Sequence, residues 1–468
     1  MKNQYTYHEA TPYQKGEYLK HKYNKRELGA NNISLSQKVN KLDITYFEKA
    51  YFFIINRHEI FRTSLILIKR KIYQKVWPFN ESKYKIQYSD FSKLNDWETQ
   101  LFEIERKANQ IIFQPSLHPW INCNLIKLSA SNYYFIITIP HIISDSESIK
   151  VLLEELSIAY QCIKHEQPVT LSFPYQFGEY TDTWVESIKS KGDRHKKFWR
   201  KTFFELPQVN LSTKYSRVQI DRCNSYKTHI YKELEIEFGE LSYEEKDSFL
   251  GNVSYLIPKD GYFIDFVIHS DNIEILKEIC RITNVKMQLV IIASFILLNL
   301  KLTGENSALI GINTNLRDTD NLKDVMGCLI NTVILKHTIE KNQMFIEFIE
   351  NVNTTLIRAL RHKIYNFDQA LKDSDISIDQ LGGLFLNIIA KDDINSNASQ
   401  HSNFILSEEK CHPYFDLDLH IYIYNNLISF RCHYKNDLFQ ASTIEFIFSE
   451  YLKLITGLKD FVNLKIEL

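Results

Sequence analysis

The sequence has no paired cysteines. Its seven cysteines lie at positions 123, 162, 223, 280, 328, 411 and 432, and no two of them form a Cys-x-x-Cys pair. An odd, scattered set is neither a disulfide framework nor a zinc site, both of which need paired or clustered residues. We therefore predict reduced thiols in a cytoplasmic protein, where cysteines are kept reduced, and no bound metal.

Long apolar segments and an excess of charge of either sign are also absent. The most apolar run, residues 289–300, is only about half as long as a membrane-spanning helix needs to be. The first ten residues, MKNQYTYHEA, lack the apolar stretch of a signal peptide. Lysine and arginine number 56, against 57 aspartates and glutamates. This balance gives no reason to expect a nucleic acid or an anionic membrane as a partner.

Several common catalytic and cofactor motifs are missing. The chain contains no G-x-S-x-G, no G-x-x-x-x-G-K-[ST] and no H-E-x-x-H sequence, which argues against the corresponding hydrolase, phosphate-binding and zinc sites. No G-x-G-x-x-G follows a strand, so a nucleotide cofactor is unsupported. We expect no cofactor to be bound to the chain. The segment Leu381-Gly-Gly-Leu-Phe385 resembles the L-G-G-x-S site of a carrier protein, but Phe385 has no hydroxyl to hold a phosphopantetheine arm.

What the sequence does contain is a regular alternation of helical and strand patterns. Hydrophobic residues make up 44% of the chain, enough for a large core. Apolar residues at helical spacing predict helices, and β-branched or aromatic runs predict strands. Helices are expected at 42–58, 147–161, 271–282, 286–302 and about 441–456, and strands at 62–68, 133–139, 307–313 and 328–335, with a hairpin over 420–434 that turns at Asn425–Asn426. This order predicts an α/β fold in two halves.

The halves are joined by a stretch that is rich in turn-forming residues. Residues 163–185 contain Pro168, Pro174 and Gly178 and are typical of a connection. Two polar, poorly patterned stretches, 208–258 and 391–412, are predicted to be long loops or insertions. We expect an N-terminal lobe over residues 1–170 and a C-terminal lobe over residues 171–468.

One histidine is placed where an α/β protein would hold a catalytic base. The short pattern H-x-x-x-D has little weight by itself, and it occurs at His141/Asp145, His412/Asp416 and His433/Asp437. Only His141 follows a buried strand and precedes a helix, the position where ligand sites gather in α/β folds. Ser144 and Glu147 match a capping box for that helix. A histidine that is merely packed at this turn is the simpler explanation of the local sequence.

Seven segments resemble, in the same order, the motifs of nonribosomal peptide synthetase condensation domains. Arg57-His-Glu-Ile-Phe-Arg62-Thr63 is similar to R-H-E-x-L-R-T, and residues 140–148, PHIISDSES, are similar to the active-site motif H-H-x-x-x-D-G. The other five are Phe198-Trp199 with Leu206-Pro207, Asn315-Leu-Arg317 with Gly327-Cys-Leu-Ile-Asn331-Thr, Tyr365-Asn-Phe367-Asp, Phe415-Asp-Leu-Asp-Leu and Tyr434-Lys-Asn-Asp437-Leu-Phe439. Together they cover nearly the whole chain.

The resemblance implies two chloramphenicol acetyltransferase-like lobes with the active site in a tunnel between them. It implies an acyltransferase of nonribosomal peptide and secondary metabolite biosynthesis that forms an amide bond. Its substrates would be a carrier-bound acyl or aminoacyl thioester and an amine acceptor. The 468 residues contain no adenylation module and no carrier serine motif. We therefore expect a free-standing enzyme to which carrier proteins bring substrates in trans on phosphopantetheine arms.

The resemblance also assigns roles to single residues. His141 would assist the attack of the acceptor amine, either as general base or by positioning it. Asp145 would be structural and paired with an arginine, for which Arg317 and Arg62 are the candidates. Asn331 would approach the tunnel from the second lobe and belong to the catalytic residues, together with His141 and Asp145.

The chain departs from the family motif beside the catalytic position. Pro140 replaces the first histidine, which is tolerable at the end of a strand, and Ser146 replaces the glycine. Ser146 can still start a helix as its N-cap, and we expect Ser146 and Ser144 to contact substrate. Two alternatives stay open. The same base could serve a hydroxyl acceptor and form an ester, or the domain could be catalytically silent and only bind a carrier protein or recruit a partner.

Overall fold

The structure is a computed structural model that divides into two compact units, whose segments alternate along the sequence. Unit 1 comprises residues 1–190, 315–330 and 395–409, and unit 2 comprises residues 191–314, 331–394 and 410–468. The predicted lobe boundary between residues 170 and 171 stays a prediction. The residues described are 5–23, 32–204, 206–207, 211, 242, 261–340, 342–381, 383–390, 403–406, 415–424, 427–436 and 438–466.

The larger sheet of unit 1 has five strands in the order β12-β2-β7-β6-β5. Neighbouring strands pair antiparallel except β5 and β6, which are parallel. The central strand β7 forms from the aromatic and β-branched run predicted from sequence, and its last six residues are buried. The bounds are β12 (Asn403–Leu406), β2 (Asn32–Asn40), β7 (Asn132–Pro140), β6 (Asn122–Lys127) and β5 (Ile86–Asp90).

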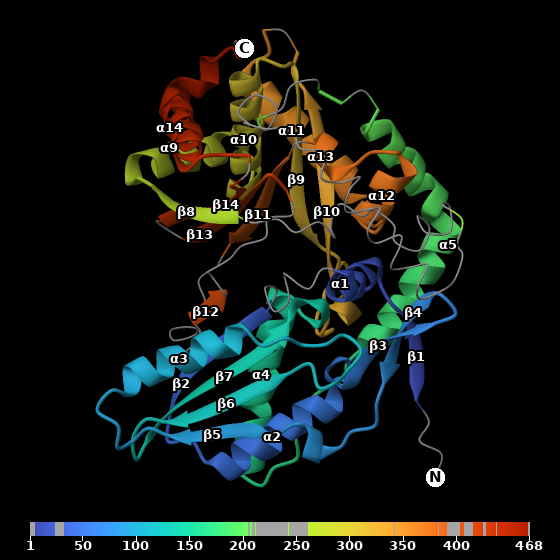
Figure 1. The fold of residues 1–468 in the computed structure, drawn as a ribbon. Helices are drawn as coiled ribbons and strands as arrows, with labels where there is room; N and C mark the ends of the chain where they lie inside the picture. Colours follow the sequence, from blue (N-terminus) through green and yellow to red (C-terminus); the bar gives the residue numbers. More distant parts are fainter. Residues whose placement is uncertain are drawn as a thin grey trace. The chain divides into compact units, whose positions relative to one another are not determined.

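Helices pack on both faces of this sheet, as Figure 1 shows for α2 (Ile44–Arg57) and α3 (Trp97–Asn109). Successive strand residues point to opposite faces, so neighbouring residues of β7 meet different helices. Phe135 packs on Phe47 of α2, with ring centroids 5.6 Å apart. Ile136 joins a buried cluster with Ala108 of α3. Helix α4 (Ser146–Lys164) lies against α2, so the strand that leads to His141 is fixed from both sides.

A three-stranded antiparallel sheet and two further helices belong to unit 1. The sheet has the order β1 (Thr6–Glu9), β4 (Lys71–Val76) and β3 (Thr63–Ile68). Helix α1 (Pro12–Tyr23) packs on the 3-10 helix η4 (His141–Ile143), which follows β7 directly. Helix α5 (Phe177–Thr202) begins in unit 1, so the predicted connection 163–185 ends at residue 176. Its start is helical because Phe177 and Tyr180, three residues apart, are both buried on one face.

Unit 2 contains a six-stranded sheet in the order β10-β9-β11-β13-β14-β8. β11 is parallel to β9 and β13, whereas β14 is antiparallel to both of its neighbours. The strands are β10 (Ile330–Thr338), β9 (Ser307–Asn315), β11 (Leu384–Ala390), β13 (Leu417–Tyr424), β14 (Leu427–Lys435) and β8 (Gly261–Ile268).

Helix α10 (Met287–Thr303) is buried on nearly all sides, as expected of a helix that is apolar all round. Helices α9 (Ser270–Thr283), α11 (Phe345–Leu360) and α14 (Ala441–Gly457) pack around it (Figure 1). The short helices α12 (Phe367–Asp373) and α13 (Ile378–Leu381) precede β11. No single helix in the described ranges is long and apolar enough to cross a membrane; α9 and α10 meet that test only as a pair, which is bent by 110°.

The predicted helices and strands are confirmed, with changes at a few places. β10 begins at Ile330 rather than at residue 328, because the backbone N–H of Leu329 bonds to Asp145 instead of to a strand. β12 lies inside 391–412, which was predicted to be irregular, and pairs with β2. Pairing of Tyr424 with Leu427 confirms the hairpin. Its turn, Asn425–Asn426, and most of 208–258 lie outside the described residues.

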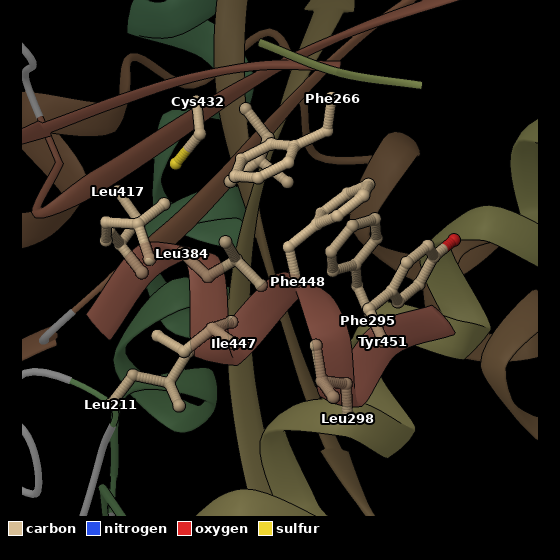
Figure 2. Close-up of a pocket in the computed structure, with 12 residues that line it drawn as sticks. Leu211, Phe266, Phe295, Leu298, Leu384, Leu417, Cys432, Ile447, Phe448 and Tyr451 are labelled. Carbon is tan, nitrogen blue, oxygen red and sulfur yellow. The ribbon is translucent and has the colours of Figure 1, made fainter. Parts of the chain in front are cut away.

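The core of unit 2 encloses a small apolar cavity, shown in Figure 2. Its volume is about 20 Å³, enough for roughly one water molecule. Aromatic rings form much of its wall; those of Phe266 and Phe448 stack with centroids 4.0 Å apart. A cavity this small inside a stacked core is a packing defect rather than a ligand site.

Candidate functional site

His141 stands at the C-terminal end of β7, where the chain turns into α4. Pro140 ends the strand with φ of −72°, the backbone angle that the proline ring imposes. At the last residue of a strand, the missing N–H disturbs the ladder least. Helix η4 then carries the half-buried His141 out of the sheet. The replacement of the family's first histidine by proline therefore leaves the strand and its turn intact.

Asp145 is bound by an arginine, and that arginine is Arg317. Two parallel hydrogen bonds of 2.7 and 2.9 Å join Nη1 and Nη2 of Arg317 to the two carboxylate oxygens. The side chains are only 4% and 3% exposed, so the charges need each other. The carboxylate also accepts the backbone N–H of Leu329 at 2.9 Å. All these residues belong to unit 1, where the pair fastens residues 315–330 to the turn after His141.

Asp145 is also the N-cap of α4, which corrects the predicted capping box. Its carboxylate accepts the backbone N–H of Ser148 at 2.9 Å. Ser144 lies one residue too early for this role, and its buried hydroxyl instead donates to the carbonyl of Pro140 at 3.1 Å. Glu147 bonds Lys150 rather than the cap. Ser146 is the exposed first residue of the helix, not its N-cap, and the substrate contacts assigned to Ser144 and Ser146 stay predictions.

Arg62, the other candidate partner of Asp145, is engaged elsewhere. Its guanidinium donates to three backbone carbonyls, those of Ile55, Asn56 and Trp77. Burial lowers the pKa of Arg62. Its role in this structure is to tie α2 to the chain after β4.

The Arg57-His58 pair of the same motif also has a structural role. Nε and Nη2 of Arg57 donate to Glu155 of α4 at 2.9 and 3.1 Å, and Nε2 of His58 lies 2.6 Å from the same carboxylate. Burial would raise the pKa of Glu155, but the hydrogen bonds from His58 and Arg57 outweigh it and hold that pKa below its ordinary value. The cluster fixes α2 against the helix that starts beside His141.

The ring of His141 contacts two side chains that the sequence did not single out. The Sγ atom of Cys328 is 3.5 Å from Nδ1 of His141. The ring of Tyr13, from α1, meets the imidazole edge-on, with centroids 6.0 Å apart and planes at 69°. Burial raises the pKa of the Tyr13 phenol well above its ordinary value, and Glu17 raises it further. Only the place of Cys328 inside the Gly327–Asn331 segment could have drawn attention to it.

Asn331 belongs to unit 2 and is saturated by the backbone around α12. Its Nδ2 donates to the carbonyls of Lys363 and Tyr365 at 2.6 and 2.7 Å. Its Oδ1 accepts the backbone N–H of Phe367 at 3.2 Å. Asn331, near the end of the motif Gly327–Thr332, is thus bonded to Tyr365 and Phe367 of the motif Tyr365–Asp368 within unit 2. The catalytic role predicted for Asn331 stays a prediction.

The two other H-x-x-x-D matches do not form sites that can be described. His433 is a residue of β14, as predicted, and its ring lies beside that of His420, with centroids 4.9 Å apart. Burial lowers the pKa of His433 to about 3. His412 and Asp437 lie outside the described residues. Within the described ranges, no three histidine, cysteine, aspartate or glutamate side chains are placed to hold a metal ion.

Comparison with known proteins places this site in a family. The family model described as "Condensation domain" matches residues 4–238 and 259–464, nearly the whole chain. The chain belongs to the condensation domain family. Condensation domains are the acyltransferases that form amide bonds in nonribosomal peptide synthesis.

Large synthetases are among the relatives of this condensation domain. It is 22% identical to bacitracin synthase 2 of Bacillus licheniformis over 91% of its length, and 23% identical to surfactin synthase subunit 2 of Bacillus subtilis (strain 168) over 96%. It spans only 15% and 11% of those two proteins. The solved condensation domain of a monacolin K polyketide synthase superposes with a TM-score of 0.73 at 13% identity, covering 98% of this chain and 99% of that one. The predicted fold of two chloramphenicol acetyltransferase-like lobes is confirmed.

Proposed function

We propose that this condensation domain joins a carrier-bound acyl or aminoacyl thioester to an amine acceptor, with His141 as the catalytic base. The placement of His141 carries the proposal. Its half-buried ring is held at the end of a rigid strand by a turn that the Asp145–Arg317 pair locks. A base held by rigid elements can be kept within hydrogen-bond reach of a substrate.

The reaction needs one proton acceptor. The acceptor nitrogen attacks the thioester carbonyl carbon, and Nε2 of His141 takes the proton that this nitrogen loses. The tetrahedral adduct then collapses, the C–S bond breaks, and the departing thiolate of the phosphopantetheine arm takes the proton back. General-base help of this kind is worth about 10²–10⁴-fold in rate, or roughly 3–5 kcal/mol of barrier.

Asp145 is not available as the base or as the group that orients His141. Its two oxygens are bonded to Arg317, Ser148 and Leu329. In a Ser-His-Asp triad the carboxylate bonds the imidazole directly, and here it does not. Asp145 is therefore a structural residue of the site, and removing it acts on the position of the turn.

The partners follow from the class of substrate. We expect small carrier proteins to present the thioesters on phosphopantetheine arms, in trans, without a cofactor bound to the domain itself. Two of the relatives are peptide synthases, which supports carrier-bound substrates. The five cysteines in the described residues are free thiols, which supports a reducing, cytoplasmic compartment.

The two departures from the family motif bear on the silent alternative. Pro140 ends β7, and Ser146 begins α4, without displacing His141 from the turn between them. This geometry favours an active site. Ester formation uses the same base, and the identity of the acceptor decides between an amide and an ester.

The proposal is tested by release of free thiol from a panel of acyl-carrier and acyl-pantetheine thioesters, each offered with amines and with alcohols. Wild type should release thiol in an amine-dependent manner and yield the amide by mass. His141→Ala should lose about 10²–10⁴-fold of that rate. His165→Ala is the matched control, because His165 is an exposed histidine that caps the C-terminus of the helix that begins beside His141. Equal rates in wild type and His141→Ala would overturn the proposal, and a product formed only with alcohols would replace the amide by an ester.

A further inference from the structure

The backbone on both sides of Cys328 is pinned by the same residues that lock the turn after His141. The N–H of Gly327 donates to Ser148 Oγ at 3.0 Å, and its carbonyl accepts from Arg317 at 3.1 Å. The N–H of Leu329 donates to Asp145 at 2.9 Å. The sulfur between them is therefore held against Nδ1 of His141 by a buried ionic network and not by its own contact alone.

The thiol at this position stays protonated. Cys328 is only 6% exposed. Burial raises its pKa well above the ordinary value, and the nearby carboxylate of Asp145 raises it further. A reactive cysteine needs the opposite environment, one that is electropositive and partly exposed. The group that faces His141 is thus a neutral thiol, which can accept or donate only a weak hydrogen bond.

The direction of that bond decides what the imidazole can do. In a neutral imidazole one nitrogen carries the proton and the other is free to accept one. If the thiol donated to Nδ1, then Nε2 would carry the proton and could not act as a base. If Nδ1–H donates to the sulfur, Nε2 is free.

We propose that Cys328 is a positioning residue for His141: its sulfur accepts the Nδ1–H of the imidazole and so keeps Nε2 unprotonated toward the substrate. The catalytic meaning of this contact rests on the proposed function, but the tautomer is a property of the resting protein. In the Ser-His-Asp triad a carboxylate does the same work. Here Asp145, four residues after His141, has its carboxylate bound by Arg317, and a neutral sulfur lies at Nδ1 instead.

The tautomer can be read without a substrate. We would record two-bond ¹H–¹⁵N correlation spectra of the full chain labelled in its 15 histidines, and assign His141 by the signals lost in His141→Gln. Wild type should show the Nδ1–H form. Cys328→Ser, which keeps a hydrogen-bond acceptor, should retain it, whereas Cys328→Ala should give a mixture of the two forms. Cys123→Ala, which removes a fully buried thiol elsewhere in unit 1, should leave the spectrum of His141 unchanged.

An Nε2–H form in wild type, or a tautomer that is unchanged in Cys328→Ala, would overturn the inference. Kinetics give a second reading. Cys328→Ala should lower kcat by about 2- to 10-fold, the worth of one modest hydrogen bond, with KM for the acceptor unchanged, and Cys328→Ser should recover most of the loss.

A covalent role for the thiol is the competing outcome. Intact mass spectrometry of wild type during turnover should show no acyl group on the protein. An acyl adduct present in wild type and absent in Cys328→Ala would make the thiol a nucleophile and overturn the positioning role. If neither the wild type nor any variant releases thiol from any thioester, the proposed function fails. The spectra still decide the tautomer of His141 in that case.

Discussion

Replacing Arg317 by alanine should test whether residues 315–330 are held on unit 1 by the buried ion pair. The change removes both hydrogen bonds to Asp145 and those to Ser148 Oγ and to the carbonyls of Val325 and Gly327. It leaves a carboxylate that is 3% exposed without a cation. Such a charge cannot be solvated in place, so the segment or the turn must move.

The expected cost follows from the contacts that remain. Breaking a buried ion pair costs about 3–5 kcal/mol. Asp145 keeps three donors after the change, the N–H and Oγ of Ser148 and the N–H of Leu329, so we expect a value near the lower end, about 3 kcal/mol. Arg317→Lys should lose most of the same stability, because a single ammonium group cannot form the two parallel hydrogen bonds that the guanidinium makes to Asp145.

The assay is urea unfolding together with hydrogen exchange followed over residues 141–150 and 315–330. Exchange is needed because a chain of two units need not unfold in a single step. Arg281→Ala is the control. Arg281 also bonds its partner Glu278 through two nitrogens, but the side chains are 71% and 47% exposed, and we expect no measurable change. Unchanged exchange in both segments, with stability within about 1 kcal/mol of wild type, would refute the assigned role of the pair.

Two further predictions concern residues close to the Asp145–Arg317 ion pair. Glu155→Gln should destabilise the protein most at neutral pH. A carboxylate whose pKa is lowered by folding stabilises the folded protein at pH values above its ordinary pKa of 4.5, and it loses that contribution as the pH falls through the lower folded pKa. The urea midpoints of variant and wild type should therefore converge in acid. A constant gap down to pH 3 would contradict this. Gly327→Ala should cost activity about 10²-fold, because its Cβ would lie 1.9 Å from the Phe177 ring and must push the segment away from His141. Gly457→Ala, whose Cβ meets nothing within 4 Å, should leave thiol release unchanged, and equal activity of the two variants would show that the segment's position does not matter.

The sequence was a good guide to the elements and a weaker one to the site. Helix α4 and strand β7 could be predicted because their apolar patterns reflect burial, which is local information. The position of His141 followed from the same patterns. The capping residue was misplaced by one position, since Ser144 and Asp145 are both good N-caps and only the backbone decides between them. The choice of Arg317 over Arg62 depended on contacts between residues 172 positions apart, which no local pattern encodes.

No sequence pattern predicted the contact between Cys328 and His141. This shows why the motif matches were more informative about the fold than about the chemistry. Arg57, His58 and Arg62 match the family's motif, and in the structure each is used to hold helices or backbone. The same holds for the bonds of Asn331 to Lys363 and Tyr365. A chain can therefore satisfy most of the motifs simply by folding as a condensation domain. Whether it also catalyses amide formation depends on the few atoms around the imidazole. Two of them decide the matter: the sulfur of Cys328 beside Nδ1, and Nε2, which we propose to be the base.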